Sequence, residues 1–567
     1  MTPGARREGS YEYDAAPPIT PFIRKCTAAA CLGGVLFGYD LGVISGALPS
    51  LTSSLQLTDS QSETVVAFLF IGSVIGSFIG GYICDKIGRK TSILVCDGIF
   101  LVGSIVLALA PSYGMILFGR IVVGIAVAVS AISDVSYLTE IAPEHHRGAL
   151  VSCNEASISL GFLLAYVSSY VVTVSVNYDQ GWRIMFGLSG LIALLQFVLM
   201  AGLPESPIWL EENGKMSEAM EALARIQAGS GAEAVRNEDI DEEDSSSDFA
   251  HPVNEAVIGT GGNDFGPLPT DENHEEQEND GTEEVVVSKL KDASGTSIGI
   301  GTRLSLTHYW RHMAIASFLA VSQQICGHIN ILNFAPEIFN EVFGSATSSS
   351  LIATTIVLGI LKFFLTTFVI FEVDRIGRRF LLLSGIFVIT VSLLSLTLAY
   401  TLGSENESEF TLPQRTLAVA GCSGVVAGYA LSCAPLTWLI VSEIFPSSIR
   451  GRALGMTTIT TNAFAALVSY TFLTGQDVFG PAMPFALYFA FSLGSFVFAT
   501  VAIPDTGSIV AGGNGEDVDQ ALGTMFLWRQ RCCVPGWFFR RKGQRETSLS
   551  PFDNVEERQD IVPPPIT

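Results

Sequence analysis

Long apolar segments alternate with short polar ones through most of the chain. Each apolar segment reaches about 20 residues, the length that an α-helix needs to cross about 30 Å of hydrocarbon. A helix also pairs its own backbone N–H and C=O groups, as the lipid interior requires. The twelve segments are residues 25–48, 63–84, 91–110, 114–138, 149–174, 184–203, 312–339, 350–372, 380–402, 416–440, 452–474 and 482–503. The pattern predicts an all-α membrane protein with twelve transmembrane helices.

Composition supports this prediction. Charged residues make up 15% of the chain, against about 25% in an average soluble protein. The net charge of −24 is mostly local, because residues 231–284 hold 18 Asp or Glu and only one basic residue, Arg236. The 10 Cys form no Cys-x-x-Cys pair, and we find no nucleotide-binding loop, metal-ligand cluster or nucleophile constellation. We therefore expect no enzyme activity, no cofactor, no metal and no nucleic-acid partner.

Three short motifs occur twice, in the same order, in the two halves of the chain. A charged turn at residues 85–90 (DKIGRK) returns at 374–379 (DRIGRR). The motif at 140–148 (EIAPEHHRG) returns at 443–451 (EIFPSSIRG), and residues 204–206 (PES) return as 504–506 (PDT). A repeat of this kind predicts two related six-helix bundles with a binding site between them near the middle of the membrane.

Basic residues fall in alternate loops. Lys or Arg occurs in the loops after the second, fourth, eighth and tenth segments, whereas the loops after the first, third, seventh and eleventh have none. Because basic loops stay in the cytoplasm, both termini and the central loop are expected to be cytoplasmic, in a protein of the plasma membrane. The Asn406-Glu407-Ser408 sequon would then lie outside, where glycosylation and chance occurrence are both open.

The repeated motifs put charged residues at matching helix ends on the cytoplasmic side. We expect them to form an inner latch, closed when the carrier is shut toward the cytoplasm and broken when it opens. The alternative is that these charges only set the topology. The latch residues are Asp85, Arg89, Glu140, Arg147 and Glu205 in the first half, and Asp374, Arg378, Glu443, Arg450 and Asp505 in the second.

The segments outside the bundles are polar. We divide the chain into an N-terminal tail (1–24), a first bundle (25–203), a central loop (204–311), a second bundle (312–503) and a C-terminal tail (504–567). Residues 208–228 are expected to form one amphipathic helix. Residues 229–296 have the composition of a disordered linker, with a regulatory role as the alternative. In the last tail, aromatic and basic residues flank Cys532 and Cys533, which favours contact with an anionic lipid surface and palmitoylation.

The chain resembles the sugar porter branch of the major facilitator superfamily over residues 25–505, apart from the acidic loop. Within that branch it is most similar to the class III facilitative glucose transporters, members ten and twelve of solute carrier family 2. The matching residues are 38–46 (GYDLGVISG), Asn154-Glu155, Gly181-Trp182-Arg183, Gln323-Gln324 with Gly327 and Asn330, Lys362, Trp438 and 442–446 (SEIFP). The resemblance implies the major facilitator fold and alternating-access sugar transport.

Two ionisable residues inside the apolar segments are candidates for proton coupling. Asp40 lies in the middle of the first segment and Arg120 early in the fourth. A charge at this depth costs about 2.5–3.5 kcal/mol on insertion scales, which favours a functional role. The resemblance implies that protonation of Asp40 releases Arg120 and lets the halves rock; a permanent structural ion pair is the alternative.

Amide and aromatic side chains are candidates for sugar binding. Gln323 and Asn330 are seven residues apart, hence on one face of a helix, and amides both donate and accept hydrogen bonds, as sugar hydroxyls do. Gly327 between them permits unwinding, and Trp438 offers an aromatic face to a pyranose. The resemblance assigns sugar contact to Gln323, Gln324, Asn330 and Trp438, and we add Glu155 and Asn333 as lining residues.

Several positions depart from the common sugar porter pattern. They are Glu155, Phe162, His328, Asn333-Phe334, Asn462 and Asp134. Lys362 has either Asp134 or Glu155 as a potential partner. We therefore expect alternating-access transport of a small neutral monosaccharide, a glucose-like hexose, across a lipid bilayer, with or without a coupled proton. A polyol carrier, for example one for myo-inositol, and a non-transporting sugar sensor are the alternatives.

Overall fold

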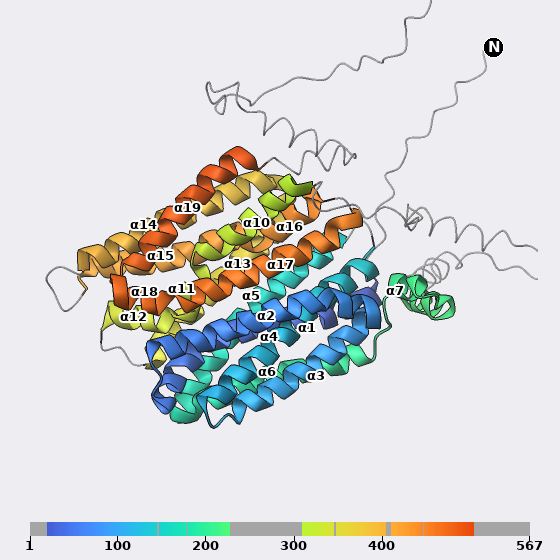
Figure 1. Cartoon of the computed structure of the whole chain (residues 1–567), viewed down its shortest axis with the longest axis horizontal. Coiled ribbons are helices and arrows are strands. Elements are labelled where there is room, and N and C mark those ends of the chain that lie inside the picture. The colour runs from blue at the N-terminus through green and yellow to red at the C-terminus, as the bar shows by residue number, and fades with distance from the viewer. Residues whose placement is uncertain are drawn as a thin grey trace, which may run out of the picture.

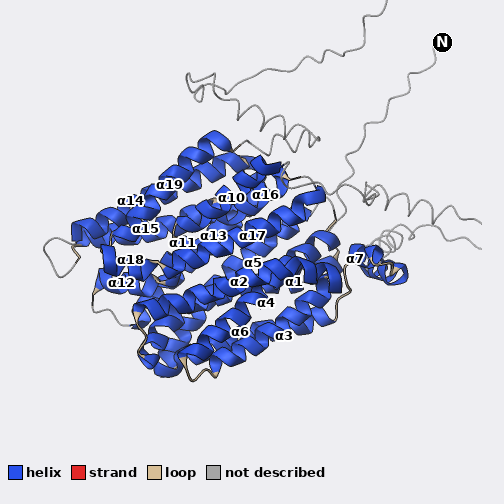
Figure 2. Ribbon diagram, viewed as in Figure 1, coloured by secondary structure: helices blue, strands red, loops and turns tan. Residues whose placement is uncertain are grey.

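The computed structural model describes residues 20–143, 147–176, 178–226, 309–344, 348–403, 410–445 and 447–503. These residues are almost entirely helical, and no strand occurs among them (Figure 2). The helices of the first half are α1 (Pro21–Leu55), α2 (Asp59–Ile87), α3 (Arg89–Ala108), α4 (Tyr113–Ile141), α5 (Arg147–Ser175), α6 (Tyr178–Ala201) and the short α7 (Pro207–Glu212). Those of the second half are α10 (Trp310–Ile325), α11 (His328–Asn333), α12 (Ala335–Phe343), α13 (Ser348–Ile376), α14 (Arg378–Gly403), α15 (Leu412–Leu431), α16 (Cys433–Ile444), α17 (Ser447–Tyr470), α18 (Phe472–Phe479) and α19 (Met483–Ala502).

The two halves lie side by side as two helical bundles (Figure 1). Their most extensive contacts are those of α2 with α17 and of α5 with α13. One end of the assembly carries α7, and the other carries α12 and α18 (Figure 1). We call the first the charged end, because it also holds the turns at Gly88 and Gly377, and the second the opposite end. The prediction of an all-α fold in two six-helix bundles is confirmed.

The number of membrane-spanning helices needs one comment. Eleven helical segments of the described chain are long and apolar enough to cross a membrane, counting the broken pairs α10–α11 and α15–α16 as one each. α17 is the twelfth segment expected from the sequence, and it falls outside this set because its middle is polar, with Thr457, Thr458, Thr460, Thr461 and Asn462. It nevertheless packs between α10 and α2, and Thr457 and Thr461 of its polar middle are buried.

The repeated charged turns have the same geometry in both halves. Gly88 (φ 102°) ends α2 and Gly377 (φ 95°) ends α13, a backbone conformation that favours glycine. Two residues after each glycine, a basic side chain donates to a backbone carbonyl on the last helix of its half. Lys90 reaches the oxygen of Ala201 at 3.1 Å, and Arg379 reaches that of Thr500 at 2.7 Å.

Three of the expected membrane helices are broken, and the one at 452–474 divides at Thr471, between α17 and α18. The segment at 312–339 is three helices, because Gly327 has a left-handed conformation (φ 70°) between α10 and α11, and Pro336 begins α12. A side chain at Gly327 would collide with the ring of Tyr488, so the break also allows close packing. The segment at 416–440 divides at Ser432, between α15 and α16.

Other boundaries differ from expectation. The first helix starts at Pro21 rather than at 25, since Thr20 accepts a hydrogen bond from the N–H of Ile23 and caps it. The helix expected at 208–228 is two helices, α7 and residues 216–226, separated by a turn at Gly214 (φ 74°). The acidic linker, the sequon, residues 1–19 and the C-terminal tail, with Asp505, Cys532 and Cys533, lie outside the described residues.

The closest helix contact of the first half, between α1 and α5, predicts a sensitivity to added volume. A Cβ at Gly38 would collide with the backbone carbonyl of Ile158, which cannot rotate away, whereas a Cβ at Gly98 meets no atom within 4 Å. We expect Gly38→Ala to lower the free energy of unfolding by about 1–3 kcal/mol, and Gly98→Ala to cause no loss. Thermal unfolding of both variants in one detergent measures this, and equal melting temperatures would contradict it.

Candidate functional site

A buried ion pair lies inside the first half. The guanidinium of Arg120 on α4 donates to the carboxylate of Asp40 on α1 at 3.2 Å, and both side chains are 1% exposed. Arg120 also donates to the backbone oxygen of Val65 at 3.2 Å. One carboxylate oxygen, Oδ1 of Asp40, has no partner among the described atoms. The structure thus joins the two residues proposed for proton coupling, and a single proton on Asp40 would remove the negative charge that balances Arg120.

The amides of the second half lie on both sides of the break at Gly327. Gln323 on α10 donates to the hydroxyl of Tyr429 at 2.8 Å. Asn330 on α11 donates to the carbonyl of Val468 at 2.8 Å and to the hydroxyl of Tyr488 at 2.9 Å. The expectation that Gln323 and Asn330 share one helix face is therefore wrong, because α10 ends at Ile325 and α11 begins at His328. Gln324 and Asn333 are also buried, and Trp438 on α16 is half-buried.

Several buried polar atoms on α5, α10, α11 and α16 have no hydrogen-bond partner in the described part of the chain. Leaving such an atom unpaired costs about 1–3 kcal/mol. Their positions on α5, α10, α11 and α16 place acceptors on both halves. They are Oε1 of Gln323, Oδ1 of Asn330, Oδ1 of Asn333, the hydroxyl of Tyr166, Oδ1 of Asn154 and Oγ1 of Thr437. Hydroxyl groups of a ligand would satisfy them, because a hydroxyl donates as well as accepts.

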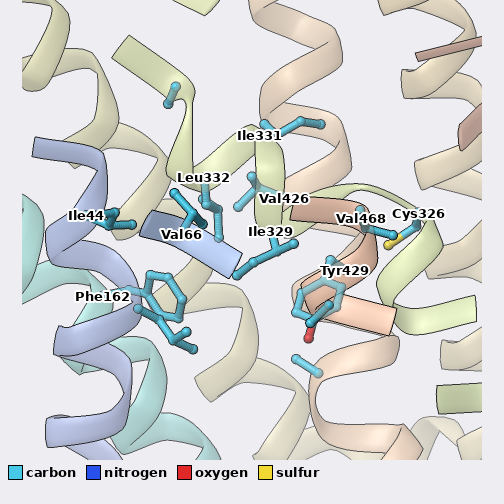
Figure 3. Close-up of a cluster of buried hydrophobic side chains, with 14 of the residues drawn as sticks. Ile44, Val66, Phe162, Cys326, Ile329, Ile331, Leu332, Val426, Tyr429 and Val468 are labelled. Carbon is cyan, nitrogen blue, oxygen red and sulfur yellow. The ribbon is translucent and has the colours of Figure 1, made fainter. Parts of the chain in front are cut away.

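A lysine and three rings complete this region. Nζ of Lys362 on α13 lies 3.4 Å from the centre of the Phe162 ring on α5, a cation–π contact between the two halves. Its anionic neighbour is Glu155 rather than Asp134, which decides the alternative that the sequence left open. His328 stacks on Tyr429 with 3.3 Å between ring centres. Figure 3 shows Phe162 and Tyr429 at the two sides of an apolar layer that includes Ile329 and Leu332 of α11.

Side-chain hydrogen bonds between the halves occur at three places in the described chain. At the opposite end, the carboxylate of Glu63 on α2 accepts from the backbone N–H (3.0 Å) and the hydroxyl (2.5 Å) of Thr474 on α18. Nearer the middle, Asn462 donates to Ser77 at 3.4 Å and Ser159 to Thr366 at 3.2 Å. Thr474 lies in the first turn of α18, where backbone N–H groups lack partners within the helix, so Glu63 caps a helix of the other half.

At the charged end, every described ion pair stays within one half. Arg89 binds Glu140 at 2.9 Å and Asp85 at 3.2 Å, and Arg378 binds Glu443 at 3.4 Å. Glu205 accepts from the backbone N–H groups of Lys90 (2.7 Å) and Thr91 (3.1 Å) at the start of α3. Ser206 donates to Glu140. The side chains of Arg147, Asp374 and Arg450 lie outside the described set.

Sequence reasoning missed three members of the site. Tyr429 and Tyr488 orient Gln323 and Asn330, yet each stands in an apolar segment with no neighbouring polar residue to mark it. The sequence predicts a helix that ends at Thr474 and gives no sign that Thr474 contacts the other half. Only the pairing of helices in space brings these residues to the amides and to Glu63.

Comparison with known proteins identifies one family over both halves of the chain. A family model described as "Sugar (and other) transporter" matches residues 26–259 and 270–509. The arabinose-proton symporter of Escherichia coli (strain K12) is 30% identical over 483 residues, which cover 85% of this chain and 90% of the symporter. The solute carrier family 2 facilitated glucose transporter member 10 of Danio rerio is 28% identical, covering 88% and 93%, and polyol transporter 5 of Arabidopsis thaliana is 28% identical, covering 90% and 88%.

Solved structures agree with these relatives. The inward open conformation of the xylose transporter XylE from E. coli is 25% identical and superposes with a TM-score of 0.64, over 88% of this chain and all of the other. Its partially occluded inward open conformation gives a TM-score of 0.63 at 24% identity, over 85% of this chain. Because one family model spans both bundles and a relative aligns at 30% identity over most of its length, this chain belongs to the sugar transporter family and has the major facilitator fold.

Proposed function

We propose that the protein carries a glucose-like hexose across the plasma membrane by alternating access, with a proton as the coupled ion. The observation that carries this proposal is the set of buried, unpaired polar atoms shared between α5, α10, α11 and α16. A neutral polyhydroxylated ligand can both donate to these atoms and accept from the amides. Relatives that include an arabinose-proton symporter and facilitated glucose transporters support the same substrate class.

Within this proposal the sugar binds between the halves. Gln323, Gln324, Asn330 and Asn333 supply hydrogen bonds from the second half, and Trp438 supplies an aromatic face for the apolar side of the ring. Glu155 and Lys362 line the site as a charged pair from opposite halves. Their charges cancel, which keeps the site suited to a neutral ligand and unfavourable for an ionic one.

We assign the charged end to the cytoplasm, because basic residues concentrate there. Glu63 and Thr474 hold the halves together at the outer end, while the described ion pairs at the inner end do not cross between halves. In the outward-facing conformation, the same charged turns would approach each other and act as the inner latch.

Coupling in this scheme depends on Asp40. When Asp40 is ionised, its contact with Arg120 ties α1 to α4. Protonation removes the charge that holds Arg120 and leaves the guanidinium to the Val65 carbonyl, which loosens α1 relative to α4. A polyol is the second candidate substrate, since polyol transporter 5 of Arabidopsis thaliana is a relative and a linear polyol carries the same hydroxyl groups.

The coupling role predicts a separation between accumulation and exchange. Asp40→Asn should abolish sugar accumulation driven by a pH gradient in proteoliposomes, because the side chain no longer binds a proton. Exchange of labelled for unlabelled sugar should persist within about threefold, since exchange needs no net proton movement. Asp59→Asn, at an exposed position at the start of α2, is the matched control and should behave as wild type. Accumulation by the Asp40→Asn variant would contradict the role.

The binding role predicts a loss of sugar affinity without a loss of fold. Gln323→Leu should raise the dissociation constant for glucose about fivefold, since a net hydrogen bond contributes about 1 kcal/mol and 1.4 kcal/mol is tenfold in affinity. Gln180→Leu, at an exposed position on α6, should leave it unchanged. Calorimetric titration with glucose, xylose and myo-inositol measures both the effect and the preferred ligand. Equal constants for the two variants would rule out this role of Gln323.

The outer contact predicts a shift between conformations. Charge-assisted hydrogen bonds contribute about 1.5–3 kcal/mol, so Glu63→Leu should raise the outward-open population by about tenfold or more. Spin labels introduced by Asp59→Cys and Val478→Cys, in a Cys153→Ser background, report the separation of α2 and α18. A longer label distance in the Glu63→Leu variant is expected. An unchanged distance distribution would show that other contacts hold this end closed.

A further inference from the structure

Two aspartates lie buried in the first half, apart from the Asp40–Arg120 pair. Asp97 on α3 and Asp134 on α4 are each 1% exposed. Asp97 stands eight residues after Arg89, the start of α3, hence about 12 Å along the helix from the charged end. Neither residue takes part in the sugar site or in the contacts between halves.

The two carboxyl groups have unequal surroundings. Asp134 accepts hydrogen bonds from the hydroxyl of Ser130 at 3.0 Å and from the amide of Gln196 on α6 at 3.3 Å. Both oxygens of Asp97 are without a hydrogen-bond partner in the described residues. Oε1 of Gln196, which is 0% exposed, is also unpartnered there, although the amide that carries it reaches Asp134.

No basic side chain of the described residues comes within 4.0 Å of either aspartate. The basic side chains of Arg89 and Arg120 form ion pairs with other residues, Arg89 with Glu140 and Arg120 with Asp40. The groups that face the aspartates are neutral: the thiols of Cys31 on α1 and Cys96 on α3, the hydroxyl of Ser130 and the amide of Gln196. The strongest charge acting on Asp97 is therefore that of Asp134. Two like charges in an apolar interior cannot both persist without a cation.

We propose that Asp97 and Asp134 form a second proton-binding site, in which Asp97 holds the proton and Asp134 the negative charge. The hydrogen bonds determine which of the two carboxyl groups carries the proton. Two donors stabilise an ionised Asp134, whereas nothing stabilises an ionised Asp97. The site is tied to α1 as well, because a Cβ at Gly33 would collide with the Asp134 carboxylate. Loss of the proton would thus leave two carboxylates that repel each other between α3 and α4. This repulsion would act next to α1, the helix that carries Asp40.

This site goes beyond the proposed function, and its test does not depend on transport. Infrared difference spectra of the purified full-length protein, taken between acidic and alkaline buffer, report the C=O stretch of protonated buried carboxyl groups. We expect Asp97→Asn to remove one such component from the wild-type spectrum. Asp134→Asn should retain it, and the control Asp59→Asn should leave the spectrum unchanged. Potentiometric titration should show about one proton fewer bound by the Asp97→Asn variant.

Three results would overturn the proposal. Identical spectra and proton counts for wild type and Asp97→Asn would mean that Asp97 does not titrate. Loss of the component in Asp134→Asn but not in Asp97→Asn would place the proton on the other residue. Loss of the component in wild type on adding Na⁺ at constant pH would make a metal cation the ligand. Circular dichroism of each variant confirms that the helices are retained, so an unfolded variant cannot imitate the expected loss.

Discussion

Polar groups inside an apolar bundle have no water to bind, so each needs a partner within the protein. This constraint organises the described structure. Arg120 is satisfied by Asp40 and a carbonyl, and Glu63 by the first turn of α18. Where partners are lacking, at the amides of α10 and α11 and at Asp97, we propose that a ligand or a proton binds. The unpaired atoms therefore point to function more directly than the paired ones.

The same constraint explains why each half can move as a unit. The charged turns fasten the helices within a half, through Arg89–Glu140 in the first and Arg378–Glu443 in the second. Between halves, the described side chains make hydrogen bonds at only three places, and one cation–π contact joins Lys362 to Phe162. Strong bonds inside the halves and few between them are what rocking of two bodies requires.

The sequence was sufficient for the architecture and for part of the site. Apolar length and the repeated turns predicted two bundles, because both reflect local rules of helix length and glycine conformation. The pairing of Asp40 with Arg120 was predicted from the family resemblance. The sequence permits a helix break at Gly327 but does not show that one occurs. It therefore predicts that Gln323 and Asn330 lie on one helix face. Tyr429, Tyr488 and Thr474 had no local signal, since their roles come from helices far away in sequence. The ionic partner of Lys362, Glu155 rather than Asp134, could be assigned only from the packing of α13 on α5.

The ionisable and the hydrogen-bonding parts of the site are divided between the halves. Asp40, Arg120, Asp97 and Asp134 all belong to the first half, whereas the amides of α10 and α11 belong to the second. In the proposed scheme, protonation of Asp40 changes the first half, whereas most of the proposed sugar contacts come from the second. A sugar that contacts the amides can respond to the charge state only through the surface where the bodies meet. Lys362 of the second half and Phe162 of the first lie on that surface, and their cation–π contact is a place where a change in one half can reach the other.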